Sequence, residues 1–414
     1  MDCNTNKKQG RGQFIAQDYG ASGVLYEVGS VYGRMLKLSD VRKARGKLYR
    51  LEDVLMMIVL AKLCGEDRPS GIAEWAKNHR EVLVQLLHWS RPAFPSHSTY
   101  RRILAYIVYQ EEIERLVGEY NQAGEHGEVY AMDGKAPRGM RKKDDDFSEY
   151  LLSVYDVEQS KVLSQVAVGR KENEITKAPK ALENVKIKGK IITADAMHTQ
   201  RRLSAVITEQ GADYVFPVKE NQPALYQSIQ QLFAPEYPKP GFGKIQTDFL
   251  SAEKVNKGQS GSVVQNHGRL EKRILTTSEM LNPYSTWPGL AQVYRLERHF
   301  QWFRSSRCYH TSCETEFGIT SLDRTQATPM RLLKIRRLHW GIENGLHGRR
   351  DVTFHEDATR MTTGHMGKVM ASINNLVIAL TRQAKFENTA QARRYFAAHL
   401  SDAFLLLTMP FSRP

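Results

Sequence analysis

Residues 189–200 read GKIITADAMHTQ, and the apolar run at 191–194 ends directly at Asp195. A short run of apolar and β-branched residues bounded by glycine and charged residues predicts a buried strand. The same pattern occurs upstream, where EVYAM at 128–132 ends directly at Asp133. We therefore expect two short buried strands, each followed by an aspartate.

The elements around these two strands indicate the fold class. The sequence predicts strands at 128–132, 150–155 and 162–168, a helix at 175–182, the strand ending at Asp195, a helix at 199–210 and a strand at 212–218. Such alternation predicts an α/β fold, and this order of elements is that of the ribonuclease H-like (retroviral integrase-like) fold.

Changes in sequence pattern divide the chain into five expected segments. Between about 225 and 328 the alternation gives way to β-type sequence with glycine-rich turns, a length that is implausible for a structureless loop. We expect an all-α N-terminal domain at 1–125, the first part of the ribonuclease H-like core at 126–225, a β-rich insertion at 226–328, the second part of the core at 329–385 and a helical C-terminal tail at 386–414.

The N-terminal helices include a candidate DNA-binding element. PSHSTYRRIL at 95–104 combines a proline-marked turn, a serine that can cap a helix, and a helix carrying Arg101 and Arg102. Short helices with a capped, basic last member resemble a helix-turn-helix unit. A helical packing domain with an ordinary charged face fits the same pattern.

The charge of the chain favours a polyanionic partner. Lys and Arg total 59 against 45 for Asp and Glu, a formal net charge of +14. Positive potential of this size attracts phosphates and releases their counterions, so we expect nucleic acid as the partner.

Cysteine usage and hydropathy indicate a soluble cytoplasmic protein. The four cysteines are scattered, which suits a reducing compartment. RCYHTSC at 307–313 groups two cysteines with a histidine, but a structural zinc would need a second ligand pair, and the sequence offers none. No stretch is apolar for the roughly 20 residues that a membrane span needs, and the N-terminus does not resemble a signal peptide.

A helix predicted from Pro329 to about Arg350 carries a third acid, Glu343. In RLLKIRRLHWGIENGLHGRRDV at 331–352, apolar residues at helical spacing form a core-facing stripe: Ile335, Leu338, Ile342 and Leu346. A second face comprises Arg336, His339, Glu343, His347 and Arg350. A carboxylate flanked by basic groups suits a metal ligand beside a phosphate backbone, although an exposed face with Glu–Arg and Glu–His pairs has the same periodicity.

Three acids of this kind point to metal-dependent phosphodiester chemistry. Two divalent ions roughly 4 Å apart commonly activate the nucleophile and stabilise the leaving oxygen in such reactions. Mg²⁺ prefers carboxylate oxygens, and Asp133 and Asp195 are both predicted at strand ends, where a rigid sheet fixes ligand positions. An aspartate at a strand end is also a common turn residue, so the pair alone does not decide the function.

Several sequence blocks, in order, carry a family resemblance. They are DGKAPRG at 133–139, ENEITKAP at 172–179, GKIITADAMHTQ at 189–200, GADYVFPVKENQPAL at 211–225, HGRLEKR at 267–273 and HWGIENGLHGRRDVTFHED at 339–357. With these blocks the chain resembles the DDE transposases of ISAs-type bacterial insertion sequences, which include the H-repeat-associated proteins. The resemblance extends over roughly residues 30 to 410 and is far more specific than any single motif.

The resemblance implies a catalytic triad and its cofactor. The family's acids match Asp133, Asp195 and Glu343, which would bind two Mg²⁺ or Mn²⁺ ions, cut double-stranded DNA at the insertion-sequence ends and join it to target DNA. It also implies a homodimer on DNA. Arg350 and His339 stand where relatives place basic residues that contact DNA.

Further DNA contacts are expected around the acids. Lys135 and Arg138 follow Asp133 closely, and PVKENQ at 217–222 follows a neighbouring strand. We expect phosphate contacts from the following residues: Lys135, Arg138, Lys219, Asn221, Gln222, Arg336, His339, His347, Arg350, Arg101 and Arg102.

Two departures from the family pattern leave other functions open. Gly348 replaces a usual aromatic residue, and Thr362 stands near a usual arginine. Loss of those contacts would weaken DNA binding without removing a metal ligand. The alternatives are a decayed transposase that acts as a DNA-binding regulator, and a structure-specific nuclease on the same fold.

Overall fold

The structure is a computed structural model that describes residues 17–20, 22–141, 149–170, 172–234, 247–255, 269–304 and 307–409. The chain forms two compact units. Unit 1 comprises Met1–Leu116, Gly364–Val369 and Leu380–Pro414, and unit 2 comprises Val117–Thr363 and Met370–Ala379.

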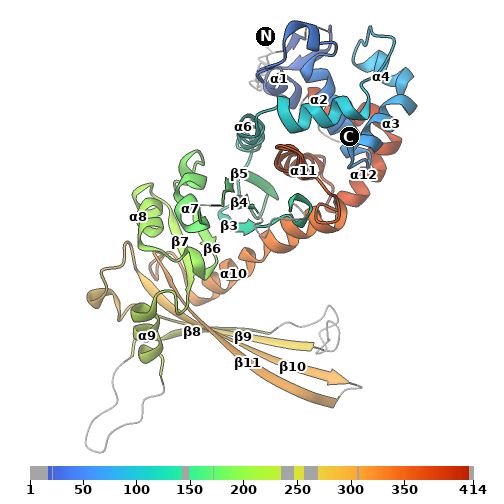
Figure 1. The fold of residues 1–414 in the computed structure, drawn as a ribbon. Helices are drawn as coiled ribbons and strands as arrows, with labels where there is room; N and C mark the ends of the chain where they lie inside the picture. Colours follow the sequence, from blue (N-terminus) through green and yellow to red (C-terminus); the bar gives the residue numbers. More distant parts are fainter. Residues whose placement is uncertain are drawn as a thin grey trace, which may run out of the picture. The chain divides into compact units, whose positions relative to one another are not determined.

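Unit 2 is built on one mixed sheet (Figure 1). Within the described residues its strand order is β5-β4-β3-β6-β7-β11-β10-β9-β8. The first five strands along the chain are β3 (Val129–Lys135), β4 (Tyr150–Asp156), β5 (Lys161–Val168), β6 (Ile191–Ala194) and β7 (Asp213–Val218). The last four are β8 (Leu250–Val255), β9 (Arg269–Ser278), β10 (Gln292–Arg304) and β11 (Arg307–Thr320).

Five neighbouring strands of the sheet, in the order β5-β4-β3-β6-β7, confirm the expected ribonuclease H-like core. β3, β6 and β7 run parallel, while β4 and β5 are antiparallel to their neighbours. Helices α7 (Glu174–Glu183) and α8 (Arg201–Glu209) lie between the strands in the chain, as the sequence predicted. Their apolar residues join a core with the buried side chains of the strands, among them Met132, Ile192 and Phe216.

The expected β-rich insertion extends this same sheet. β11 pairs antiparallel with β7, where Phe317 lies opposite Val218. β10 and β11 form a long hairpin, and β9 and β8 follow on its outer side. A helix, α9 (Pro223–Leu232), precedes these strands (Figure 1). The region is thus β-rich, and its described strands add to the core sheet instead of forming a separate one.

The helix expected from Pro329 to Arg350 changes its winding part-way. It starts as α10 (Pro329–His339), with Thr328 Oγ1 accepting a hydrogen bond from the Arg331 backbone N–H. π-helical turns follow at Glu343–His347 and Arg349–Thr353. The apolar side of α10 packs into a second core, which includes Leu332 and Ile335. Insertions of π-helix into α-helices occur frequently at functional sites.

Unit 1 combines helices from both ends of the chain. Its helices are α1 (Val31–Met35), α2 (Leu51–Leu63), α3 (Pro69–Asn78), α4 (Arg80–Leu86), α5 (His97–Arg102), most of α6 (Gln110–Asn121), α12 (Thr389–Ala398) and α13 (Leu400–Thr408). α2 is buried on nearly all sides, as its uniformly apolar sequence predicted. α12 and α13 pack against α2, so the C-terminal tail is part of the N-terminal unit.

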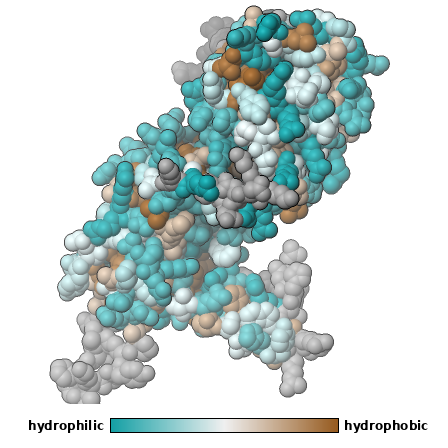
Figure 2. Space-filling model, viewed as in Figure 1, coloured by the Kyte–Doolittle hydropathy of each residue, from teal (hydrophilic) through white to brown (hydrophobic). Residues whose placement is uncertain are grey.

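Two details of this region differ from expectation. Unit 1 is not all-α, because β1 (Gln17–Tyr19) and β2 (Leu25–Glu27) form a short antiparallel hairpin. α11 (Met366–Gln383) contributes to both units, since its residues 370–379 belong to unit 2. On the face shown in Figure 2, hydrophilic residues cover most of the surface and hydrophobic residues form small groups. None of the described helices has the length and apolarity to cross a bilayer.

Candidate active site

Asp133 and Asp195 directly follow the last paired residues of two adjacent parallel strands, although β3 itself continues past Asp133 to Lys135. Met132 on β3 pairs with Ala194 on β6, and each aspartate is the next residue of its chain segment. The preceding residues are buried, whereas the Asp195 side chain is 58% exposed and that of Asp133 is 19% exposed. The sheet therefore places the two carboxylates side by side, facing out of the core.

Two histidines from the Glu343 segment contact these aspartates. His339 Nε2 lies 3.3 Å from Asp195 Oδ1, and His347 Nε2 lies 3.2 Å from Asp133 Oδ2. His339 is itself buried, and its Nδ1 shares a hydrogen bond of 3.1 Å with Thr193 Oγ1 on β6. Both ends of the segment are thus attached to the two strand ends.

Glu343 stands between the two histidines in the chain, four residues from each. Partial burial raises the pKa of the Glu343 carboxyl, and the negative charges of Asp133 and Asp195 raise it further. The hydrogen bond from His339 lowers the pKa of Asp195. Charges influence each other's pKa only at short range, so the three acids share one electrostatic site.

The donor set fits a hard divalent cation by its chemistry. Three carboxylates supply the oxygen ligands that Mg²⁺ and Mn²⁺ prefer, and a cation would relieve their mutual repulsion. As the side chains lie here, no three His, Cys, Asp or Glu residues of the described ranges are grouped closely enough to hold an ion. The histidines occupy one oxygen of each aspartate, and those contacts would have to change for metal binding.

The two cations after Asp133 have different surroundings. Lys135 Nζ lies 2.7 Å from Asp351 and 3.5 Å from Asp357, and its side chain is only 10% exposed. Arg138 is 87% exposed at its side chain, while its backbone N–H donates to Asp357. Arg138 is therefore placed to reach a ligand in solution, and Lys135 attaches β3 to the end of the Glu343 segment.

The PVKENQ motif supports the turn that follows Asp195. Asn221 Nδ2 donates to the Ala196 carbonyl at 2.7 Å, and Gln222 Nε2 donates to the Thr199 carbonyl at 3.0 Å. Lys219 is exposed and lines a cavity of about 380 Å³ together with Asp195 and Asn221. The two amides hold the backbone beside the acid, and Lys219 contributes positive charge to the same cavity.

Arg336 and Arg350 are both buried and paired with glutamates, and for Arg350 this burial corrects the expected DNA contact. Arg336 is 5% exposed and forms two hydrogen bonds with the Glu316 carboxylate, at 2.9 and 3.0 Å. Arg350 has no exposed surface, and its guanidinium donates to Glu356 at 2.8 and 2.6 Å. A guanidinium enclosed in the fold does not reach a phosphate in solution, so Arg350 stabilises the segment instead.

The two arginines of the N-terminal region belong to the other unit. Arg101 and Arg102 occupy the last turn of α5 and are exposed. α5 packs against α3 within unit 1. Their exposure is compatible with the expected role in binding DNA, which stays a prediction.

Sequence patterns did not identify a fourth acid beside the site. Glu174 begins α7, and a side chain at Gly134, directly after Asp133, would overlap the Glu174 carboxylate. The buried His198, three residues after Asp195, lies 3.5 Å from Glu174. Both residues lie in sequence blocks that carry the family resemblance. Gly134 of DGKAPRG leaves the space that Glu174 of ENEITKAP fills, so these two blocks could have indicated the contact.

Comparison with known protein families shows to which family this chain belongs. Residues 126–380, more than half of the chain, match the family described as transposase DDE domain. The chain belongs to this family. Residues 33–120 match a second family, described as DDE_Tnp_1-associated, which accompanies it in the N-terminal part of this member.

Individual relatives of this DDE family member extend the match to nearly its full length. YbfL of Escherichia coli K12 is 26% identical over 385 residues, covering 89% of this chain and 97% of the relative. The "H repeat-associated putative transposase YhhI" of the same strain is 25% identical over 384 residues, with the same coverage. The H-repeat relative YbfD is 30% identical over 200 residues, 47% of this chain and 78% of the relative. The resemblance to H-repeat-associated proteins is thus confirmed.

A solved structure of piggyBac transposase, in a synaptic complex with hairpin DNA, also matches. It covers 91% of this chain and 77% of that chain, with a TM-score of 0.44 and 10% sequence identity.

Proposed function

We propose that this chain is a DDE transposase that cleaves double-stranded DNA at insertion-sequence ends and joins the freed 3′-end to target DNA. Asp133, Asp195 and Glu343 are its catalytic residues in this proposal. Its membership of the transposase DDE domain family supports the reaction class. The chain's formal net charge of +14 supports a polyanionic substrate.

One geometric observation carries the assignment of the residues. The two strand-end aspartates are adjacent, and each is held by a histidine of the segment that carries Glu343 between them. Two aspartates that are far apart in the sequence thus lie side by side, and the segment that carries Glu343 is bonded to both of them. If the aspartates were ordinary turn residues and Glu343 lay on an ordinary exposed helix face, these contacts between them would not be needed.

The three carboxylates would hold two Mg²⁺ or Mn²⁺ ions, which when bound activate the attacking oxygen and stabilise the leaving oxygen. The protein's own residues then position the DNA. Arg138 and Lys219 are exposed near Asp133 and Asp195 and are proposed to bind backbone phosphates. His339 and His347 orient the aspartates and release an oxygen of each when the site is loaded.

The expected working form is a homodimer that holds both DNA ends, in the cytoplasm at the nucleoid. This part of the proposal rests on the family alone. It is tested by the mass of the complex with end DNA in solution.

The reaction is tested by incubating the protein with labelled end DNA, a target plasmid and Mg²⁺ or Mn²⁺. The expected products are nicked ends and ends joined to the plasmid. Asp133→Asn, Asp195→Asn and Glu343→Gln should each lower the rate at least about 100-fold, because each removes a charged ligand of a catalytic ion. Glu209→Gln, which replaces an exposed acid on α8, is the matched control and should keep wild-type activity.

The outcomes separate the candidate functions. Strand transfer that depends on all three acids supports the transposase. Cleavage without joining identifies a nuclease on the same fold, and binding without cleavage identifies a DNA-binding regulator. Full activity in any of the three acid variants would contradict the assignment of that residue.

A further inference from the structure

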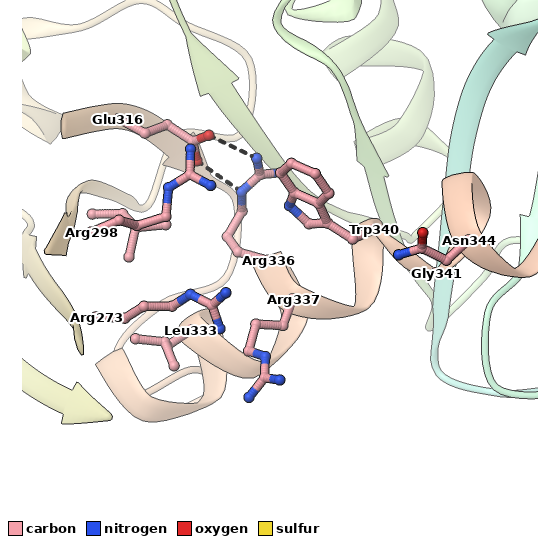
Figure 3. A pocket seen from close by; sticks show the side chains of 10 residues that line it. Arg273, Arg298, Glu316, Leu333, Arg336, Arg337, Trp340, Gly341 and Asn344 are labelled. Atoms are coloured by element: carbon pink, nitrogen blue, oxygen red, sulfur yellow. Dashed lines mark hydrogen bonds and ion pairs between the residues drawn. The ribbon is translucent and has the colours of Figure 1, made fainter. Parts of the chain in front are cut away.

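A basic cavity lies between α10 and the strands β9, β10 and β11, all within unit 2 (Figure 3). Its volume is about 400 Å³. Its polar lining comprises Arg273, Arg298, Glu316, Arg336, Arg337 and Asn344. Asn344 directly follows Glu343, so the cavity borders the segment that carries the third acid.

The cavity has more positive than negative charge. Four arginines line it against one glutamate, Glu316, which is bound by Arg336. Glu271 pairs with Arg273 at 2.7 Å, and Glu314 pairs with Arg298 at 2.8 Å. Arg337 has no carboxylate within ion-pair distance in the part of the chain described. One positive charge remains even when all three glutamates are counted.

Two of these arginines each have a buried guanidinium nitrogen that has no hydrogen-bond acceptor among the described residues. Arg336 is 6% exposed at its side chain, and its Nη1 has no hydrogen-bond partner. Arg273 Nη1 is likewise buried and unpartnered. Burial lowers the pKa of Arg273, and the neighbouring charges of Arg337 and Arg298 lower it further, although Glu271 opposes them. Buried donors normally have a partner, and here an anion would supply both the acceptor atoms and the missing charge.

The geometry of the lining favours a phosphate. Figure 3 shows the guanidinium group of Arg336 bonded to Glu316, with the side chains of Arg273, Arg298 and Arg337 also lining the cavity. The Arg298 guanidinium lies 5.8 Å from the centre of the Trp340 ring, which is a cation–π distance. Planar guanidinium forks match phosphate oxygens, and a cavity of this volume also admits the sugar attached to a phosphate.

We propose that this cavity binds a phosphate group of the DNA strand and thereby positions the strand next to Glu343. The proposal rests on the function proposed above and adds a substrate contact to it. Arg298 and Arg337 provide the exchangeable contacts, and Arg336 provides the fixed donor at the bottom. The phosphate is either an internal phosphodiester or a terminal 5′-phosphate.

The test measures binding of a short random-sequence duplex in EDTA, so that no cleavage interferes. Arg298→Ala and Arg337→Ala should each weaken binding severalfold and reduce the slope of log K against log salt by about one. Lys334→Ala is the matched control, because it removes one exposed positive charge from α10 without touching the cavity. Arg337 is exposed, so its replacement is expected to leave the fold intact, which a thermal unfolding curve checks.

A second arm compares 5′-phosphorylated with 5′-hydroxyl duplex. A wild-type preference for the phosphorylated duplex that both arginine variants lose identifies the terminal phosphate, and equal affinities identify an internal one. If both variants bind with the affinity and salt slope of Lys334→Ala, the cavity is not a DNA site and the inference is overturned. Wild-type protein that binds no DNA would instead contradict the proposed function itself.

Discussion

At the scale of single residues, His339 favours the ionised state of Asp195. His339 is positioned by its hydrogen bond with Thr193 and by its own burial, and its Nε2 contacts one oxygen of Asp195. This hydrogen bond to Asp195 is the main cause of the lowered pKa of Asp195. A carboxyl with a lowered pKa stays ionised further into the acid range, and an ionised carboxylate is what a metal ion needs.

His339→Phe should therefore change the pH dependence of DNA cleavage. Without the hydrogen bond, the pKa of Asp195 returns upward toward its usual value, so the acid limb of the rate profile moves to higher pH. The ratio of variant to wild-type rate should be smallest at about pH 4 and below, near the ordinary aspartate pKa of about 3.9, and should recover above about pH 5, where a free carboxyl is ionised in either protein. Rates measured across this range with saturating Mn²⁺ check the shift.

The control for this prediction is His399→Phe, which replaces an exposed histidine of unit 1 whose ring Nδ1 contacts the Tyr395 carbonyl at 2.9 Å. Its profile should overlay the wild type. An acid limb that stays in place in His339→Phe, with a rate reduced equally at every pH, would show that His339 acts on geometry and not on the charge of Asp195.

At the scale of elements, the buried cluster around Arg350 holds the π-helical segment in place. Arg350 binds Glu356, which also accepts from Asn374 on α11 at 3.1 Å. Arg350 Nη1 reaches Gln165 on β5, and Asn375 of α11 donates to the same Gln165 oxygen at 2.9 Å. The segment with Glu343 is thus tied to a strand and to a helix that lie far from it in the sequence.

Arg350→Met should destabilise unit 2 by roughly 3 kcal/mol, because it leaves Glu356 buried without its partner. Arg360→Ala, a nearby exposed arginine, should change the free energy of unfolding by less than about 0.5 kcal/mol. Denaturant unfolding of both variants measures the difference. Equal stability of the two would show that the buried pair contributes nothing beyond its volume.

The same pair gives an acid-dependent stability. Burial alone would raise the pKa of Glu356, but the charge of Arg350 and the hydrogen bonds from Arg350 and Asn374 outweigh it and lower the pKa. Its contribution is complete above the ordinary glutamate pKa of about 4.3 and is lost as the pH falls through the lower folded value. Glu356→Gln should remove this part of the acid sensitivity of unit 2.

For the segment from Pro329 to Arg350, sequence periodicity predicted the buried apolar side correctly but not the burial of the polar side. Ile335, Ile342 and Leu346 are buried as the apolar stripe required. The residues predicted on the polar face differ in burial, because Arg336 and Arg350 are buried in the fold whereas Glu343 is exposed. A helical pattern assumes uniform winding and shows no partners, whereas the acceptors Glu316 and Glu356 come from β11 and from a loop beyond the π-helical turns. The positions of Asp133 and Asp195 were predictable because short apolar runs mark strands regardless of partner, although β3 continues beyond its predicted end at Met132 to Lys135.

At the scale of the whole molecule, the two ends of the chain complete one unit. Asp67, after α2, binds Lys62 at 2.9 Å and Arg393 of α12 at 2.8 Å. Arg393 Nε also donates to the Lys62 carbonyl at 3.0 Å. Lys62 and Arg393 are both buried, so this network seals the contact between the N-terminal helices and the C-terminal ones. A segment that reads as a tail in the sequence is therefore structural.

Arg393→Met should loosen unit 1 and leave unit 2 unchanged. It removes one of the two cations that Asp67 binds and one of the donors to the Lys62 carbonyl, a loss of roughly 3 kcal/mol for a buried pair. Hydrogen exchange should accelerate at the α2 amides, Leu51–Leu63, and stay at the wild-type rate in β3 and β6, because local stability follows the contacts of each unit. Arg394→Met, its exposed neighbour on α12, should leave both regions at the wild-type rate. Faster exchange in β3 and β6 as well would mean that the two units unfold as one, and that the end-to-end network stabilises the sheet carrying Asp133 and Asp195.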